Sequence, residues 1–171
     1  PDRSKRPWFG STVSSDLPPP QRFDIDCHLC PGNTRSSGAV NPNYKGTFVF
    51  TNDFSPFTCN NPLSVGDSSD ELIRMEIVGG ISKVICYSPH HSRTLPELSN
   101  YSVRQIIDTW CEELDELGKK FIWVQIFENK GELMGCSQPH PHGQIWATNF
   151  PPSEIVRKEQ NLRIYHETLG G

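Results

Sequence analysis

Alternating and nearly continuous apolar runs along the chain predict several strands. Residues 47–51 (TFVFT) alternate and are rich in β-branched and aromatic side chains, which favours a strand. The runs at 73–78 and 83–88 are separated by a glycine pair at 79–80, which predicts an antiparallel hairpin. The almost unbroken apolar run at 121–127 predicts a central strand.

Apolar side chains that recur every three or four residues predict two helices. Ser99 can cap the first helix, which is expected to end at Gly118. Its apolar stripe is expected to face the core and consists of Val103, Ile106, Ile107, Trp110, Leu114 and Leu117. The second helix is expected to begin at Ser153, and its inner side to consist of Ile155, Leu162, Tyr165 and Leu169. Strands in sequence with helices packed on them predict an α+β fold built mainly on an antiparallel sheet.

Composition and charge limit the classes of protein to consider. The 171 residues, 35% of them hydrophobic, suffice for one domain, expected at 27–171 after an arm and proline-rich linker at 1–26. The net charge of −4 gives no general attraction to nucleic acid or an anionic membrane. No apolar run approaches the roughly 20 residues that cross a bilayer, and the first ten residues lack a signal-like apolar segment. We therefore expect a soluble, cytoplasmic protein.

Cys27 and Cys30 form a CxxC pair that favours a metal site. Six cysteines fit either disulfides or free thiols, and the lack of a signal segment favours reduced thiols. Two thiolates on a tight turn can bind one tetrahedral ion such as Zn²⁺. A redox pair is the alternative, but no βαβ pattern of thioredoxin type surrounds this one. Two further ligands are needed, and the candidates are His90 or His91 and the histidines of 135–147.

The segment 135–147, GCSQPHPHGQIWA, carries the main candidate chemistry. In an extended chain, His140, His142 and Gln144 would point to one side. A neutral imidazole has one bare ring nitrogen, so it can ligate a metal or attack an electrophile, and two histidines allow both roles. An isolated HxH pair is more often a surface patch. Here the apolar run at 145–147 predicts a buried strand that fixes these side chains.

This segment resembles the active-site signature of the galactose-1-phosphate uridylyltransferase family, a branch of the histidine-triad superfamily. Gln144 matches this branch, whereas Gln138 departs from the Asn or Ser expected there. The resemblance runs from Arg3 to about Phe150 and implies the first half of a longer, duplicated histidine-triad-like fold. It implies a homodimer in galactose metabolism that transfers UMP from UDP-glucose to galactose 1-phosphate through a uridylyl-histidine.

The resemblance also implies a role for each candidate site residue. His142 is the expected nucleophile, assisted by hydrogen bonds from Gln144 and Ser137. The expected ligands of one structural Zn²⁺ are Cys27, Cys30, His91 and His140. The expected substrate-binding residues are Arg3 and Arg6 at the phosphates, Leu29, Asn52 and Asp53 at the uridine, and Asn129, Gly135 and Cys136. A backbone carbonyl near His140 is expected to hold the second ring nitrogen of His142.

Some interpretations stay open at this point. A polar pair such as Asn52 and Asp53 at a strand end commonly bonds local backbone in a turn, and a solvated arm is the simpler interpretation of 1–10. Family members carry a carboxylate for a second, iron-type metal where this chain has Lys158, so that site is absent or shifted to Glu159. The alternative functions are an adenylyl-transferring sugar-nucleotide phosphorylase and a zinc-stabilised nucleotide-binding module without catalysis.

Overall fold

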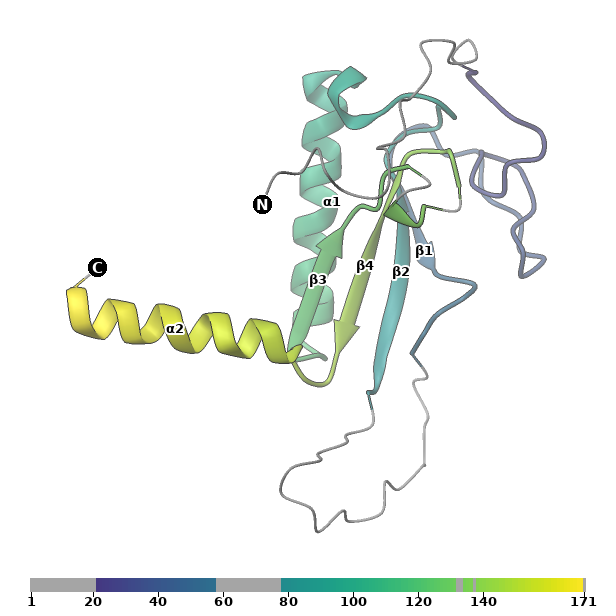
Figure 1. The fold of residues 1–171 in the computed structure, drawn as a ribbon. Coiled ribbons are helices and arrows are strands. Elements are labelled where there is room, and N and C mark those ends of the chain that lie inside the picture. The colour runs from purple at the N-terminus through teal and green to yellow at the C-terminus, as the bar shows by residue number, and fades with distance from the viewer. Residues whose placement is uncertain (1–20, 58–77, 132–133, 137, 171) are drawn as a thin grey trace, which may run out of the picture.

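The computed structural model describes residues 21–57, 78–131, 134–136 and 138–170. In this part of the chain, four antiparallel strands form one sheet with the order β1-β2-β4-β3 (Figure 1). The strands are β1 (Phe48–Thr51), β2 (Gly80–Cys86), β3 (Trp123–Phe127) and β4 (His142–Thr148). The helices are α1 (Asn100–Gly118), α2 (Ser153–Leu169) and the 3-10 turn η2 (Leu95–Glu97). The predicted antiparallel α+β fold is confirmed.

Strand β4 lies between β2 and β3. It pairs with β2 along its whole length, from Cys86 opposite His142 to Gly80 opposite Thr148. Its other side pairs with β3. The prediction that 121–127 forms a central strand is wrong, because β3 lies at an edge of the sheet that the structure describes. An apolar run indicates that side chains are buried, but it does not determine whether the strand pairs with one neighbouring strand or with two.

Gly80 belongs to strand β2 and not to a hairpin turn. The predicted turn at 79–80 is therefore wrong, and the run at 73–77 that was expected to precede it lies outside the described residues. A Cβ atom at Gly80 would collide with the backbone carbonyl oxygen of Ala147 on β4. Close approach of two strands explains this glycine better than a turn does.

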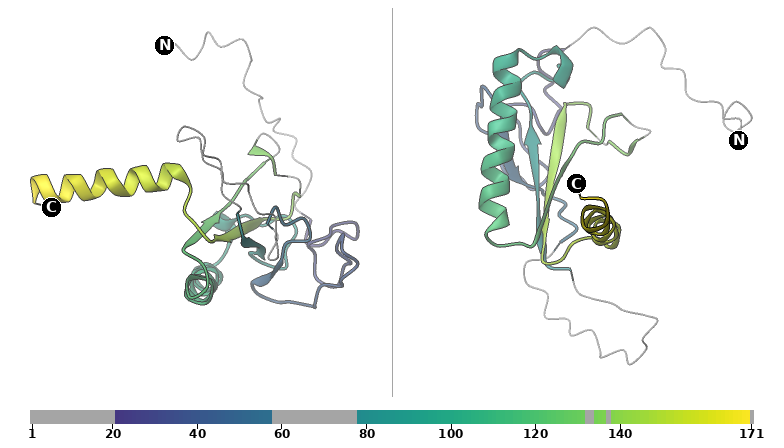
Figure 2. Two further views of the ribbon diagram at one scale, coloured as in Figure 1. Left: turned by 90° about the horizontal axis from the view of Figure 1, so that it is seen from below. Right: turned by 90° about the vertical axis from the view of Figure 1, so that its left-hand side faces the viewer.

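The two faces of the sheet are covered by different segments. Helix α1 runs along one face (Figure 2) and packs there on a core of Ile85, Tyr87, Ile106, Leu117, Ile145 and Ala147. The other face packs on the segment that holds the cysteine pair, through Cys27, Leu29, Cys30, Val84 and Cys86. Because side chains alternate along a strand, His142 and Gln144 lie on the opposite face from Ile145. The polar side chains of β4 therefore share a face with the cysteine pair.

Helix α1 begins at the predicted cap, since the Ser99 hydroxyl accepts the amide of Ser102 at 3.2 Å. Ile106 and Leu117 are buried, as expected for the inner stripe. Ile107 and Leu114 are 43% and 50% exposed, so their assignment to the core is wrong. The sheet covers only a narrow strip of this helix, and the apolar positions beside that strip stay in contact with water.

Helix α2 begins at Ser153 as predicted, but it extends away from the sheet (Figures 1 and 2) and has no buried residue. The predicted inner side is wrong, because Leu162 and Leu169 are 69% and 68% exposed. A helical repeat of apolar residues predicts the helix without specifying what covers it. No helix in the described part of the chain has the length and apolar character to cross a membrane.

Gly143 on β4 leaves room for the ring of Tyr87. A Cβ at this position would lie 2.5 Å from the Tyr87 hydroxyl and 3.2 Å from the carbonyl oxygen of Phe127. We expect Gly143→Ala to lower the free energy of unfolding by about 1–3 kcal/mol, because the buried ring has to shift. Urea unfolding measures this loss. Adding Tyr87→Phe removes the hydroxyl and is expected to recover part of it; an unchanged stability of Gly143→Ala would contradict the close contact.

Candidate active site and metal cluster

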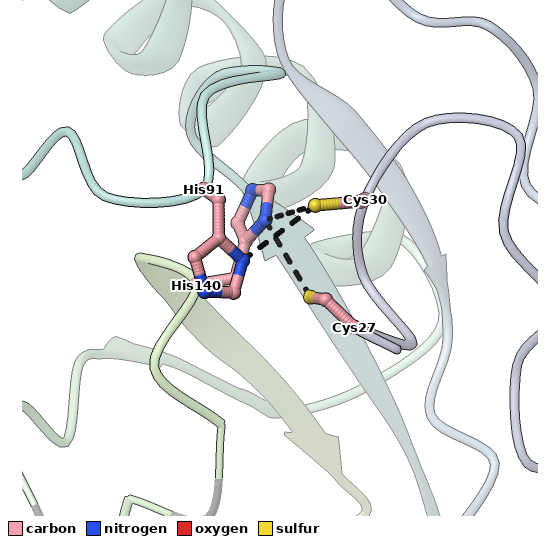
Figure 3. A group of neighbouring side chains, drawn as sticks. All are labelled: Cys27, Cys30, His91 and His140. Carbon is pink, nitrogen blue, oxygen red and sulfur yellow. Dashed lines mark hydrogen bonds between the residues drawn. The ribbon is translucent and has the colours of Figure 1, made fainter. Parts of the chain in front are cut away.

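Four buried thiol and imidazole side chains meet near the start of β4 (Figure 3). Cys27 and Cys30 come from the segment before β1, His91 follows β2, and His140 precedes β4. Their ligand atoms all lie within 4.8 Å of one another. This Cys₂His₂ set suits a tetrahedral ion. The predicted grouping is confirmed as one that could hold a metal ion, and His91 rather than His90 belongs to it.

Both histidines direct the Nδ1 atom of the ring at the thiols. His140 Nδ1 lies 3.5 Å from Cys30 Sγ, and its Nε2 lies 3.0 Å from the carbonyl oxygen of Ser88. A carbonyl can only accept, so Nε2 carries the hydrogen and Nδ1 keeps its lone pair. His91 Nδ1 lies 3.6 Å from the same sulfur, and its Nε2 faces Asp24 Oδ2 at 3.7 Å.

Burial keeps two side chains of this cluster, Cys27 and His140, uncharged when no cation is bound. It raises the pKa of the Cys27 thiol to about 12 and lowers the pKa of His140 to about 4. A neutral imidazole is already competent to ligate, whereas each thiol has to lose its proton. The residues present fit a thiolate-binding divalent cation such as Zn²⁺, whose charge would offset the cost of burying thiolates.

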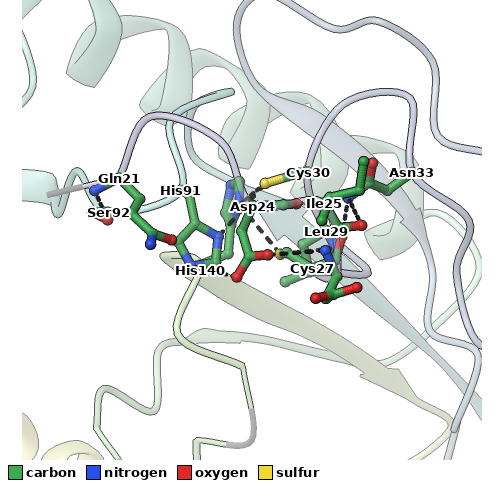
Figure 4. A network of polar contacts seen from close by, with 11 residues as sticks. Gln21, Asp24, Ile25, Cys27, Leu29, Cys30, Asn33, His91, Ser92 and His140 are labelled. Atoms are coloured by element: carbon green, nitrogen blue, oxygen red, sulfur yellow. Dashed lines mark hydrogen bonds and ion pairs between the residues drawn. The ribbon is translucent and has the colours of Figure 1, made fainter. Parts of the chain in front are cut away.

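The segment 21–26 packs against the cluster (Figure 4). The His91 amide donates to the Arg22 carbonyl oxygen at 3.1 Å, and the Asp26 amide donates to Asp24 Oδ1 at 2.9 Å. The side-chain amide of Asn33 donates to the carbonyl oxygens of Asp24 and Cys27 at 2.8 and 2.7 Å. These bonds fix the turn that carries the thiols.

Asp24 was not singled out from the sequence, where it is one of two acidic residues shortly before the CxxC pair. Its carboxylate is the polar partner that faces His91 Nε2. Such a partner fixes the ring of a metal ligand, so we expect Asp24→Asn to weaken metal retention about 10–100-fold. The rate at which a chelator removes the ion from the purified protein measures this effect. Asp26→Asn is the matched control in the same turn, and equal rates for both variants would contradict the prediction.

His142 lines two clefts and is held in one orientation. Its Nδ1 donates to the carbonyl oxygen of His140 at 2.8 Å. The predicted carbonyl acceptor near His140 is confirmed. Because Nδ1 carries the hydrogen, Nε2 keeps a lone pair and is the ring atom with which His142 can attack an electrophile.

The two clefts have volumes of about 190 and 360 Å³, and His142 and Gln138 line both. The other predicted site residues that line the smaller cleft are Leu29, Asn52, Asp53 and Gln144. Those that line the larger cleft are Asn129, Cys136 and His140. Segments far apart in the sequence thus converge around one imidazole ring.

Asn52 and Asp53 combine turn chemistry with a place in the smaller cleft. Asn52 Oδ1 accepts the amide of Phe54 at 2.9 Å, which is the local bonding expected of a strand end. Asp53 is held from outside the turn, since Oδ2 accepts the Ser37 amide at 3.4 Å and Oδ1 lies 3.5 Å from an Arg35 nitrogen. Sequence reasoning missed Arg35, which no motif marks.

The structure does not place every predicted site residue at these clefts. Arg3, Arg6 and Ser137 lie outside the described residues. Gly135 is exposed, with φ of +81°, and lines neither cleft. Lys158 is exposed on α2, so the expectation about a second metal stays a prediction.

Comparison with known proteins agrees with the resemblance. Residues 1–152 match the family model described as galactose-1-phosphate uridyl transferase, N-terminal domain. The chain belongs to this family. A galactose-1-phosphate uridylyltransferase from Haemophilus influenzae is 47% identical over 165 residues, which cover 96% of this chain and 47% of that relative. One from Rattus norvegicus is 46% identical over 168 residues, covering 98% and 44%.

This member of the uridyl transferase family spans about half the length of the curated relatives that it matches. A solved uridylyltransferase structure matches the fold with a TM-score of 0.72 and 22% identity, over 91% of this chain and 48% of that one. An ADP-glucose phosphorylase from Arabidopsis thaliana with bound ADP-glucose matches with a TM-score of 0.65 and 20% identity, over 88% and 49%. At these identities, the structural matches show a shared fold.

Proposed function

We propose that this family member transfers UMP from UDP-glucose to galactose 1-phosphate through a covalent uridylyl-histidine at His142. One observation carries the proposal. The 2.8 Å hydrogen bond from His142 Nδ1 to the His140 carbonyl oxygen leaves Nε2 bare on a ring that lines both clefts. Relatives at 46–47% identity that are named galactose-1-phosphate uridylyltransferases support the same activity.

In the first step, His142 Nε2 attacks the α-phosphorus of UDP-glucose. A nitrogen–phosphorus bond forms while the bond from phosphorus to the glucose 1-phosphate oxygen breaks. The ring becomes positively charged, and its Nδ1–H then donates a stronger, charge-assisted hydrogen bond to the His140 carbonyl oxygen. In the second step, a phosphate oxygen of galactose 1-phosphate attacks the same phosphorus. The nitrogen–phosphorus bond breaks, UDP-galactose leaves and the neutral imidazole returns.

Neutral hydrogen-bond donors assist this transfer. Gln144 Oε1 accepts from the Trp146 indole nitrogen at 3.3 Å, so the amide nitrogen of Gln144 is the group that would donate to the phosphoryl oxygens. Asn129 would donate from the larger cleft. Ser137, which lies outside the described residues, is proposed as a further donor on the family resemblance alone. Fixed neutral dipoles stabilise the charge of the transferring group without titrating.

The smaller cleft is the proposed uridine site. Leu29 would pack on the base, and Asn52 and Asp53 would bind the nucleoside. Arg3 and Arg6 are proposed to bind the phosphates, as the family resemblance implies, with Gly135 and Cys136 close to the transferring group. The homodimer and the division into an arm at 1–26 and a domain at 27–171 likewise stay proposals that rest on the resemblance and the composition.

The Cys₂His₂ cluster is proposed to hold one structural Zn²⁺ through Cys27, Cys30, His91 and His140. Four protein ligands would leave no coordination position for a substrate, so the ion would fix the local backbone. His140 would link this cluster to the nucleophile through its carbonyl oxygen. Free thiols such as those of Cys27 and Cys30 persist in a reducing compartment, and the cytoplasm is the one we propose.

The protein in its native length, incubated with UDP-glucose labelled at the α-phosphate, tests the proposal. Label is expected on His142 and, as in other phosphoramidates, to resist alkali and to leave in acid. Addition of galactose 1-phosphate is expected to move the label into UDP-galactose. A parallel incubation uses ADP-glucose labelled at the α-phosphate. Preferential labelling by ADP-glucose would favour the adenylyl-transferring alternative, and no labelling by either would favour the non-catalytic module.

A further inference from the structure

The loop at 34–40 has a fixed backbone beside the smaller cleft. An antiparallel bridge joins Thr34 and Val40 at its base. The Arg35 amide donates to the Ala39 carbonyl oxygen at 2.8 Å, and the Gly38 amide donates to the Arg35 carbonyl oxygen at 2.9 Å. Arg35 is therefore anchored at both its backbone amide and its carbonyl, which restricts where its side chain can reach.

This loop contacts both oxygens of the Asp53 carboxylate. Arg35 Nη1 lies 3.5 Å from Oδ1, and the Ser37 amide donates to Oδ2 at 3.4 Å. The side chains of Arg35 and Asp53 are only 15% and 13% exposed. Because each carboxylate oxygen can accept two hydrogen bonds, these contacts leave acceptor capacity for a ligand in the cleft that both residues line.

A second contact holds the guanidinium in place. Arg35 Cζ lies 4.1 Å above the ring centroid of Phe50 on β1, a cation–π geometry. Among the described residues, the buried Arg35 Nε makes no hydrogen bond, and the buried Nη1 makes only the 3.5 Å ion pair with Asp53. A purely structural arginine would normally bond these donors, so the arrangement favours a role in a site that a ligand completes.

We propose that Arg35 is a positioning residue that orients Asp53 to accept hydrogen bonds from the two vicinal hydroxyls of a ribose. This inference rests on the proposed function, because it assigns the smaller cleft to a nucleoside. Its consequence is specificity for the sugar of the nucleotide. A 2′-deoxyribose leaves one acceptor of a largely buried carboxylate unpaired, and sites built to bond a hydroxyl reject analogues that lack it.

The experiment compares UMP with dUMP by calorimetry, and UDP-glucose with its 2′-deoxy analogue by turnover. The unmodified protein is expected to bind UMP about tenfold or more tightly than dUMP. Arg35→Met is expected to reduce this preference at least about threefold, through KM rather than kcat, because His142 is untouched. Arg35→Lys retains the charge and is expected to recover part of the preference. Asp53→Asn is expected to lose the ribose preference. Adding Arg35→Met to Asp53→Asn is expected to cause no further loss of this preference.

Arg104→Met is the matched control. Arg104 also pairs with an aspartate, at 3.2 Å from Asp108, but its side chain is 76% exposed on α1. The ribose preference of the Arg104→Met variant is expected to equal that of the unmodified protein. An Arg35→Met variant that stays folded and weakens both nucleotides equally would overturn the proposal, as would an additive loss in the double variant. An unmodified protein without ribose preference would overturn it too.

The affinity measurements test this inference separately from the proposed function. UMP and dUMP affinities require no turnover, so Arg35 can be tested in a protein that transfers no uridylyl group. Ribose preference without turnover would support the role of Arg35 and overturn the transferase proposal. Turnover with equal use of UDP-glucose and its 2′-deoxy analogue would support the transferase proposal and overturn the role of Arg35.

Discussion

Replacing His142 with alanine is expected to lower uridylyl transfer by on the order of 10⁴-fold or more, because removal of a nucleophile eliminates the covalent route. Substrate binding is expected to change little, since Leu29, Asn52 and Asp53 line the proposed uridine cleft independently of this ring. Steady-state kinetics with UDP-glucose and galactose 1-phosphate, together with UMP binding, measure both quantities. The effect on kcat is expected to exceed by far the effect on KM.

The matched control for this substitution is His166→Ala. His166 is exposed near the end of α2, far along the chain from both clefts, and is expected to leave kcat unchanged. A fully active His142→Ala protein would refute the assignment of the nucleophile. Rescue of His142→Gly by UMP attached to free imidazole would support it, because the small molecule replaces the missing ring.

Replacing Cys30 with alanine is expected to abolish metal binding and to lower the free energy of unfolding by more than about 3 kcal/mol. Cys30 Sγ is the atom approached by both ligand histidines, at 3.5 Å from His140 Nδ1 and 3.6 Å from His91 Nδ1. Binding of a structural metal is coupled to folding, so loss of one ligand lowers the free energy of unfolding. Elemental analysis and urea unfolding measure the two effects.

Cys111→Ser provides the control, because Cys111 is an exposed thiol on α1 that takes no part in the cluster. It is expected to retain both metal content and stability. Chelator-treated unmodified protein is expected to match the stability of Cys30→Ala, since both lack the ion. A Cys30→Ala protein that keeps its metal, or that is as stable as the unmodified protein, would contradict a structural role for the cluster.

Features set by a few neighbouring residues were predictable from the sequence. The cap at Ser99 depends on a hydroxyl three residues before the amide that it accepts, and both are visible in the chain. The orientation of His142 is similarly local, because its acceptor is the carbonyl two residues earlier. The Cys₂His₂ grouping joins distant segments, and only the family resemblance could choose His91 over His90.

Features set by distant partners were not predictable in the same way. The glycine pair at 79–80 predicts a turn, and only the structure shows that the backbone of Ala147 on β4 passes close to Gly80. The apolar positions of α2 indicate a helix, but their exposure depends on whatever surface lies opposite. Asp24 and Arg35 act through contacts with His91 and Asp53, and no spacing in the sequence connects these pairs.

The bond between His142 Nδ1 and the His140 carbonyl oxygen restricts how this stretch of chain can vary in length. An insertion of one residue between the two histidines would rotate the second imidazole to the side of the sheet that packs on α1. An insertion of two would restore the side and separate the ring from its acceptor. A change in the number of residues at this point would therefore disconnect the Cys₂His₂ cluster from the proposed nucleophile.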